Sequence, residues 1–123
     1  MIRIVGVQRN ENPHQEFVLL QNQGSLRINL RGHLLMSDCT LERDSLGETL
    51  HLFREEMLIP PGNFVILFSG IGTPRWAKTK DQQLIYYAYM NRETPVWQPC
   101  SGPMHVLSPH HTYAERREVL ILR

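Results

Sequence analysis

The sequence has little of what membrane, secreted or strongly charged proteins carry. It holds no run of about 18 apolar residues, so it contains no candidate transmembrane helix. The opening stretch MIRIVGV is too short and too strand-like for a secretory signal peptide. The 13 Lys and Arg against 12 Asp and Glu give a formal net charge of +1. No global field therefore draws the chain to a membrane or to nucleic acid, and any such binding must be local.

Cysteine is also scarce. Only Cys39 and Cys100 are present, far apart in the chain. A chain of 123 residues buries about two-thirds of its extended surface on folding, so it does not need a disulfide as a staple. We therefore expect two free thiols and, with Met1 as the natural start, a cytoplasmic protein.

Short strands dominate what the sequence does contain, and no segment has a convincing helical pattern. Turn residues separate the apolar stretches at short intervals, which is typical of an all-β sandwich or barrel. We expect one domain over residues 1–123 and a polar, mobile loop at 75–83. The predicted strands are 2–7, 16–21, 26–30, 33–36, 49–53, 63–68, 84–90, 104–107 and 117–122.

Two of these stretches are apolar at nearly every position. They are EFVLLQ and NFVILF, within residues 16–21 and 63–68. Successive side chains of a strand point to opposite faces, so this pattern predicts central strands that are covered on both sides. Periodicity alone also allows a buried helical turn for the first stretch, but its short length and polar borders favour a strand. The predicted inward residues are Val18, Leu20, Val65 and Leu67.

Three motifs in a fixed order resemble the lamin tail domain, an immunoglobulin-like module of lamins and many bacterial proteins. The first motif matches at Glu16, Val18, Leu20, Asn22 and Gly24. The second matches at Ile28, Leu30, Gly32, Leu34 and Leu35, and the third at Leu58, Pro61, Gly62 and residues 65–67. His33 stands where Trp is usual, and Gly102-Pro103 replaces a common Gly-Asp. The resemblance implies an immunoglobulin-like β-sandwich of about eight or nine short strands, with no binding residue carried over.

The matched polar and glycine positions have a structural explanation of their own. Gly24 suits a turn with positive φ, the Asn22 amide suits the same turn, and Pro60-Pro61-Gly62 suits a chain reversal. We therefore expect these residues to serve folding rather than catalysis.

Residues with catalytic or metal-binding chemistry are few. His105, His110, His111 and Cys100 do not fit the spacing of a closed four-ligand zinc site, so we predict no metal. The two carboxylates that follow His51, Glu55 and Glu56, are typical of a solvated strand end. No nucleophile motif or phosphate-binding glycine loop is present, so we predict neither an enzyme nor a cofactor.

Interaction with a protein partner is the function we predict, through a non-catalytic scaffolding module. The candidate contact residues are Arg75, Trp76, Lys78 and Lys80, with the surface around Trp97 as a further anchor, because Trp and Arg dominate interface hot spots. Local DNA binding by the same loop is the alternative, and hydrolysis is a distant third. Trp76 packing back on its own sandwich is the structural alternative. We expect no membrane and no small-molecule substrate.

Overall fold

The computed structural model describes residues 1–42, 47–100 and 102–109, and their regular secondary structure is almost entirely β. The single α-helix in the described ranges, α1 (Cys39–Glu42), is one turn long. The strands are β1 (Ile2–Gln8), β2 (Phe17–Asn22), β3 (Ile28–Asn29), β4 (Leu34–Ser37), β5 (Leu50–Leu52), β6 (Leu58–Ile59), β7 (Phe64–Phe68), β8 (Arg75–Lys78), β9 (Leu84–Tyr89) and β10 (Met104–Leu107). The all-β prediction is confirmed, and the predicted strand 117–122 lies outside the described residues.

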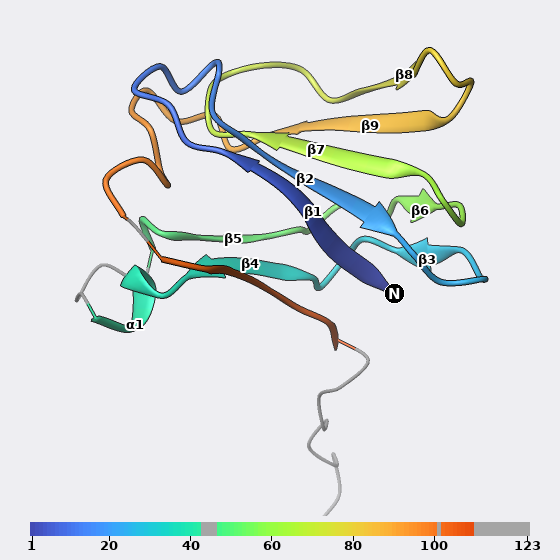
Figure 1. The fold of residues 1–123 in the computed structure, drawn as a ribbon, viewed down its shortest axis with the longest axis horizontal. Coiled ribbons are helices and arrows are strands. Elements are labelled where there is room, and N and C mark those ends of the chain that lie inside the picture. Colours follow the sequence, from blue (N-terminus) through green and yellow to red (C-terminus); the bar gives the residue numbers. More distant parts are fainter. Residues whose placement is uncertain (43–46, 101, 110–123) are drawn as a thin grey trace, which may run out of the picture.

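Two layers make up the body of the molecule, as in a β-sandwich. A five-stranded sheet has the order β1-β2-β7-β9-β8, and a three-stranded sheet has the order β10-β4-β5. Figure 1 shows the larger sheet above the smaller one, with the short pair β3 and β6 at one end. All pairs are antiparallel except β7 with β9, which run parallel.

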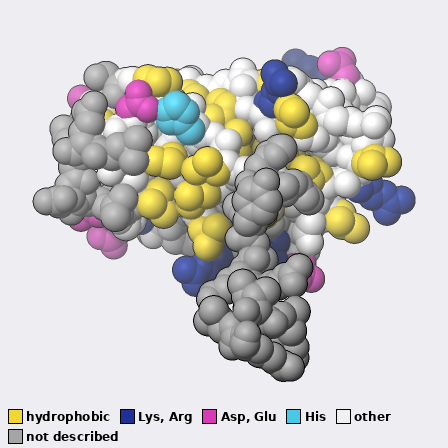
Figure 2. Space-filling view, turned by 90° about the horizontal axis from the view of Figure 1, so that it is seen from below, with side chains coloured by type: hydrophobic (Ala, Val, Ile, Leu, Met, Phe, Trp, Pro, Cys, Tyr) yellow, Lys and Arg dark blue, Asp and Glu magenta, His cyan; other side chains and the backbone are white. Residues whose placement is uncertain are grey.

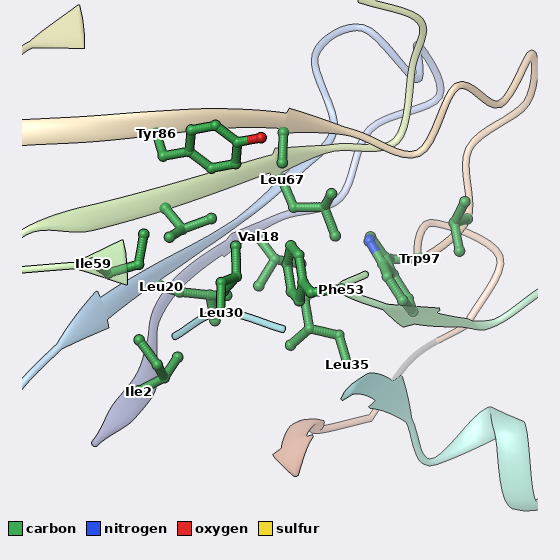
Figure 3. Packing of buried hydrophobic residues seen from close by; sticks show 13 residues of the cluster. Ile2, Val18, Leu20, Leu30, Leu35, Phe53, Ile59, Leu67, Tyr86 and Trp97 are labelled. Carbon is green, nitrogen blue, oxygen red and sulfur yellow. The ribbon is translucent and has the colours of Figure 1, made fainter. Parts of the chain in front are cut away.

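The core lies between these layers. Val18, Leu20, Val65 and Leu67 all have no exposed surface, so the predicted register of β2 and β7 is confirmed. Residues on the other side of the core close it, among them Leu30, Leu35 and Phe53, which are also fully buried (Figure 3). Such strands carry β-branched and large apolar residues because these pack well on a pleated surface.

Trp97 belongs to this core, which corrects the prediction that it marks a contact surface. Its side chain is 0 % exposed, and it is among the largest fully buried side chains of the described residues. Figure 3 draws it in the same cluster of buried side chains as Phe53 and Leu67. The sequence around Trp97 is rich in turn residues and resembles a surface loop, but the fold places it over the end of the core.

The end of β2 has the structural role predicted for its amide. Asn22 is fully buried. Its Oδ1 accepts hydrogen bonds from the backbone N–H of Gly24 at 3.0 Å and from the amino group of Met1 at 3.2 Å. Gly24 does not have positive φ, so that expectation is wrong. It is needed because a Cβ there would lie 2.5 Å from the Met1 nitrogen, whereas Gly62 does take φ of +80°.

The expected loop at 75–83 is instead a hairpin. Residues Arg75–Lys78 form β8, which pairs with β9 from Lys78↔Leu84 to Arg75↔Tyr87. The turn is closed by the N–H of Gln82, which donates to the carbonyl of Thr79 at 3.0 Å. The polar composition of an edge strand with one face in water resembles that of a loop, which explains the error.

Cys39 and Cys100 form a disulfide, which overturns the prediction of free thiols. Their Cα atoms lie 5.9 Å apart although 61 positions separate them in the sequence. The bond joins α1 to the segment that precedes β10, and Arg9 Nε donates to the Cys100 carbonyl at 3.1 Å. Tertiary packing brings the two cysteines together, so the sequence spacing carried no signal. The expectation of a cytoplasmic protein rested partly on free thiols, and the disulfide removes that support.

Candidate functional site

The four predicted contact residues do not share one surface. Arg75 and Trp76 are adjacent in β8, and adjacent strand residues point to opposite faces. The Arg75 guanidinium carbon lies 4.0 Å from the centre of the Tyr87 ring. Trp76 lies on the other face, with its ring 5.2 Å from that of Tyr86. Lys78 and Lys80 are exposed along β8 and in the following turn.

Trp76 therefore packs partly on its own sandwich. Its partner Tyr86 is 4 % exposed and belongs to the core, whereas Trp76 is 37 % exposed. The contact with Tyr86 thus agrees with the alternative prediction, in which Trp76 packs back on its own sandwich. Part of Trp76 therefore remains available to solvent.

A row of rings crosses the outer side of the five-stranded sheet, and we call it the aromatic face. It consists of Phe17, Phe68, Tyr87, Tyr89 and Arg75. The Phe68 ring lies 5.7 Å from Phe17, 6.0 Å from Tyr87 and 5.6 Å from Tyr89. The last two pairs are stacked, and Arg75 extends the row over Tyr87. Such ring pairs contribute about 0.5–1.5 kcal/mol beyond their buried area.

Strand register explains why these rings meet. Phe17 pairs with Phe68, and Phe68 pairs with Tyr89, across three neighbouring strands. Because the side-chain period of a strand is two, the rings share one face while Val18, Leu67 and Ala88 point into the core.

The positions between the rings are apolar as well. Leu19, Ile66 and Ile85 occupy outward positions and are only half-buried. In the described part of the chain no helix or strand forms a third layer over this side of the sheet (Figure 1). The strands that the sequence predicted to be covered on both sides are therefore covered by a second sheet on one side only.

The loop between β7 and β8 supports Tyr89 at the end of the aromatic face. A Cβ on Gly72 would come within 2.3 Å of the Tyr89 ring, so the backbone must pass here without a side chain. The Gly72 N–H donates to Asn91 Oδ1 at 3.2 Å, which holds this approach.

The charge of this sheet has one sign. Its five described strands contain no Asp or Glu, whereas they contain Arg3, Arg75 and Lys78. Lys78 lies on the side of Trp76, so Arg3 and Arg75 are the charges on the outer side of the sheet, and a neutral or acidic surface is their complement.

His51 borders a second feature, an open groove of about 560 Å³ between β5 and the end of β9. Burial lowers the pKa of His51, and Arg54 acts in the same direction, whereas Glu55 opposes it. Glu55 Oε2 accepts a hydrogen bond from the Tyr86 hydroxyl at 3.4 Å, and Glu56 pairs with Arg31 at 2.7 Å. Both carboxylates thus have structural partners, and the described residues that line this groove include no Ser, Thr, Cys or Lys.

The histidines and the cysteine that were candidate metal ligands do not come together in the described residues. Cys100 is in the disulfide, and the Nε2 of His105 contacts Asp38 Oδ1. His110 and His111 lie outside the described residues. Among the residues that the structure does describe, no group of three or more His, Cys, Asp or Glu side chains is placed to hold a metal ion.

Comparisons with known proteins assign no family. No family model, curated protein or solved structure matches the chain. No helix in the described ranges is long and apolar enough to cross a membrane. Function is therefore inferred from the surfaces of the molecule.

Sequence reasoning missed the aromatic face, although a signal was present. Tyr87 and Tyr89 recur at a spacing of two, and Phe17 and Phe68 end the two strands that are apolar on both faces. That pattern predicts burial inside the domain. It is equally the pattern of a sheet that another molecule covers.

Proposed function

We propose that the protein is a non-catalytic binding module that docks a partner protein on the aromatic face. The observation that carries this proposal is the apolar character of the outward positions on β2, β7 and β9, which no further layer of the described chain covers. A sheet face that remains in water alternates apolar inward residues with polar outward ones. Contiguous apolar patches on a folded domain mark interaction sites.

The residue types favour a protein as the partner. Aromatic residues and Arg are enriched in the centres of protein interfaces, and they include the residues with the largest effects on binding. The rings already pack against each other, so they lose little conformational freedom when a partner binds. Arg75 keeps guanidinium N–H groups for a carbonyl or carboxylate of that partner.

We further propose the lamin tail family and its immunoglobulin-like sandwich as the origin of this module. The two-layer β arrangement is compatible with that resemblance. The structural roles of Asn22 and Gly62 also agree with motif residues that recur for folding reasons.

Nucleic-acid binding by the β8–β9 hairpin is the second candidate. The absence of acidic residues from the five strands, together with Arg75, Lys78 and Lys80, favours it. Each phosphate contact that these residues make would release about one counterion, so binding would weaken steeply with salt.

Two double variants of β8 test the proposal. Arg75→Ala with Tyr87→Ala removes one end of the aromatic face, whereas Trp76→Ala with Lys78→Ala changes the opposite face of the same strand. Partners captured from the source cells after nuclease treatment should be lost with the first pair and kept with the second, provided that both variants retain a cooperative melting transition.

The other outcomes reject the aromatic face. Equal loss with both pairs would assign the contact to the hairpin as a whole. Capture that disappears from the wild type after nuclease treatment, with salt-dependent binding to DNA or RNA, would favour the nucleic-acid candidate.

A further inference from the structure

One edge of the five-stranded sheet has a free row of backbone groups. Strand β8 stands last in the strand order, so in the described part of the chain only β9 pairs with it (Figure 1). Edge strands carry N–H and C=O groups that no neighbouring strand uses, and an extended peptide can pair with them. We call the side of residues 75–78 that faces away from β9 the open edge.

The register of the hairpin shows which groups lie on the open edge. Thr79 donates its N–H to the Gln83 carbonyl at 2.8 Å, which makes these two residues a hydrogen-bonded pair. In antiparallel strands such pairs alternate with non-bonded pairs. Lys78 and Trp76 are therefore in non-bonded pairs, and their N–H and C=O groups point away from β9.

A hydrogen bond on the far side of β9 supports this register. Leu84 lies opposite Lys78, and its N–H donates to Asn63 Oδ1 at 2.6 Å, towards β7. The backbone groups of Leu84 thus point away from β8, as those of a non-bonded pair must. The free groups of β8 recur at every second residue, which is the repeat of another extended backbone.

The open edge lacks a bulge that would hinder an added strand. Its register against β9 is continuous from Arg75 to Lys78. At the opposite edge of the same sheet, β1 is irregular between Ile4 and Gly6. A bulge disrupts the ladder and bends the strand, which is one way in which proteins protect an edge from further pairing.

The smaller sheet has different edges. Its edge strands, β5 and β10, contain no Lys or Arg. Figure 2 views this side of the molecule from below and shows hydrophobic side chains gathered beside a histidine, among which Leu52 and Leu107 are exposed leucines. Of the edge strands in the described sheets, only β8 combines a continuous register with several positive side chains nearby.

Side chains beside the open edge define the chemistry of its partner. The charged residues between positions 75 and 80 are all positive, namely Arg75, Lys78 and Lys80. Trp76 and Lys78 are two positions apart and share one face of β8, and Trp76 is partly exposed. Directly opposite residues on neighbouring strands favour unlike charges and pairs of an aromatic with a β-branched side chain. An added strand therefore suits this edge when a β-branched residue lies opposite Trp76 and an acidic residue opposite Lys78.

We propose that β8 binds an extended acidic peptide of a partner protein as a sixth strand of the larger sheet. The peptide backbone pairs with Trp76 and Lys78, and its β-branched and acidic side chains lie two positions apart on one face. A second copy of the open edge is a poor occupant, because it would bring Arg75, Lys78 and Lys80 of two chains together. The proposal does not depend on the aromatic face, since it uses the backbone of β8.

Two synthetic peptides test strand addition on the wild-type protein. The first is a fluorescent peptide in which the sequence Val-Thr-Glu-Thr occurs twice. The second has the same side chains but carries N-methyl groups on the valine and glutamate nitrogens, whose N–H groups would face β8. Fluorescence anisotropy should show that N-methylation weakens binding by about tenfold or more, because it removes the backbone donors and keeps the charge.

Two substitutions of Lys78 separate the backbone from the charge. Lys78→Ala removes the ammonium group and keeps the N–H on the open edge, whereas Lys78→Pro removes both. The N–H of residue 78 takes no part in pairing with β9, so proline is compatible with this edge position and both variants should retain a cooperative melting transition. Lys78→Pro should weaken binding of the first peptide by about tenfold more than Lys78→Ala does.

Hydrogen exchange followed by nuclear magnetic resonance gives a readout that a side-chain contact would not move. Saturation of the wild type with the first peptide should slow exchange of the Trp76 and Lys78 amides by about tenfold or more. Equal affinity for the two peptides, or no binding of the first at millimolar concentration, would overturn the proposal. Binding that leaves both amides unprotected, and that single-stranded DNA displaces, would overturn it in favour of a nucleic-acid contact by the positive side chains.

Discussion

The Oε1 atom of Glu16 accepts a hydrogen bond from the backbone N–H of Trp97 at 2.8 Å, across 81 positions of sequence. The same oxygen accepts the N–H of Val96 at 2.7 Å and the hydroxyl of Ser69 at 2.6 Å. Glu16 is fully buried and precedes β2, so its carboxylate ties the segment that carries Trp97 to the end of the larger sheet. A buried carboxylate with several donors is a strong fixed point, because its desolvation is compensated only by those bonds.

Glu16→Gln should therefore lower the free energy of unfolding by about 1–3 kcal/mol, although the side chain keeps its size. The amide loses the charge and places an NH₂ group where only acceptors fit. Urea denaturation followed by tryptophan fluorescence measures the change. Glu11→Gln, at an exposed position, is the control and should unfold at the wild-type urea concentration.

Leu20→Ala should cost about 2–5 kcal/mol, because it removes a fully buried side chain and leaves a cavity. Leu19→Ala makes the same chemical change one position away, on the half-buried outer side of β2. We expect it to cost clearly less, which thermal or urea unfolding of the two variants will decide. Equal costs would mean that the outer side of β2 is covered as fully as the core.

Replacing both cysteines, Cys39→Ser with Cys100→Ser, should destabilise the protein by about 4 kcal/mol, the loop-closure estimate for a separation of 61 residues. Unfolding in urea without a reducing agent measures this difference. Adding a reducing agent should bring the wild type to the stability of the variant. Coincident curves without the reducing agent would contradict a disulfide in the folded protein.

Stability should fall on acidification through a contribution of His51. Burial lowers the pKa of this imidazole, so the unfolded chain binds the proton more readily than the folded chain. This destabilisation is absent above the pKa of His51 in the unfolded chain, about 6.5. It grows as the pH falls below that value, and it is complete below the pKa in the folded protein.

His51→Gln should flatten that dependence when unfolding free energies are compared between pH 7.5 and pH 5. His14→Gln, which changes an exposed histidine, should leave the wild-type slope intact. An unchanged slope in His51→Gln would show that other groups produce the acid sensitivity.

Local sequence patterns carried most of the fold. The all-β class, the strands around Val18 and Val65 and the turn at Gly62 were predictable, because alternation, β-branched residues and Pro-Gly turns act over a few residues. The register of β2 also followed, since a slip of one residue would have turned Leu20 into water.

Only the tertiary structure decided the features that join distant residues. Three such features depend on which strands become neighbours: the disulfide of Cys39 and Cys100, the hydrogen bond from Trp97 to Glu16, and the row of rings from Phe17 to Tyr89. No local sequence pattern determines the order of the strands. The same reason separates Arg75 from Trp76. The polar composition of this segment predicted a loop, but the segment pairs with β9 and is a strand. Adjacent side chains of a strand point to opposite faces.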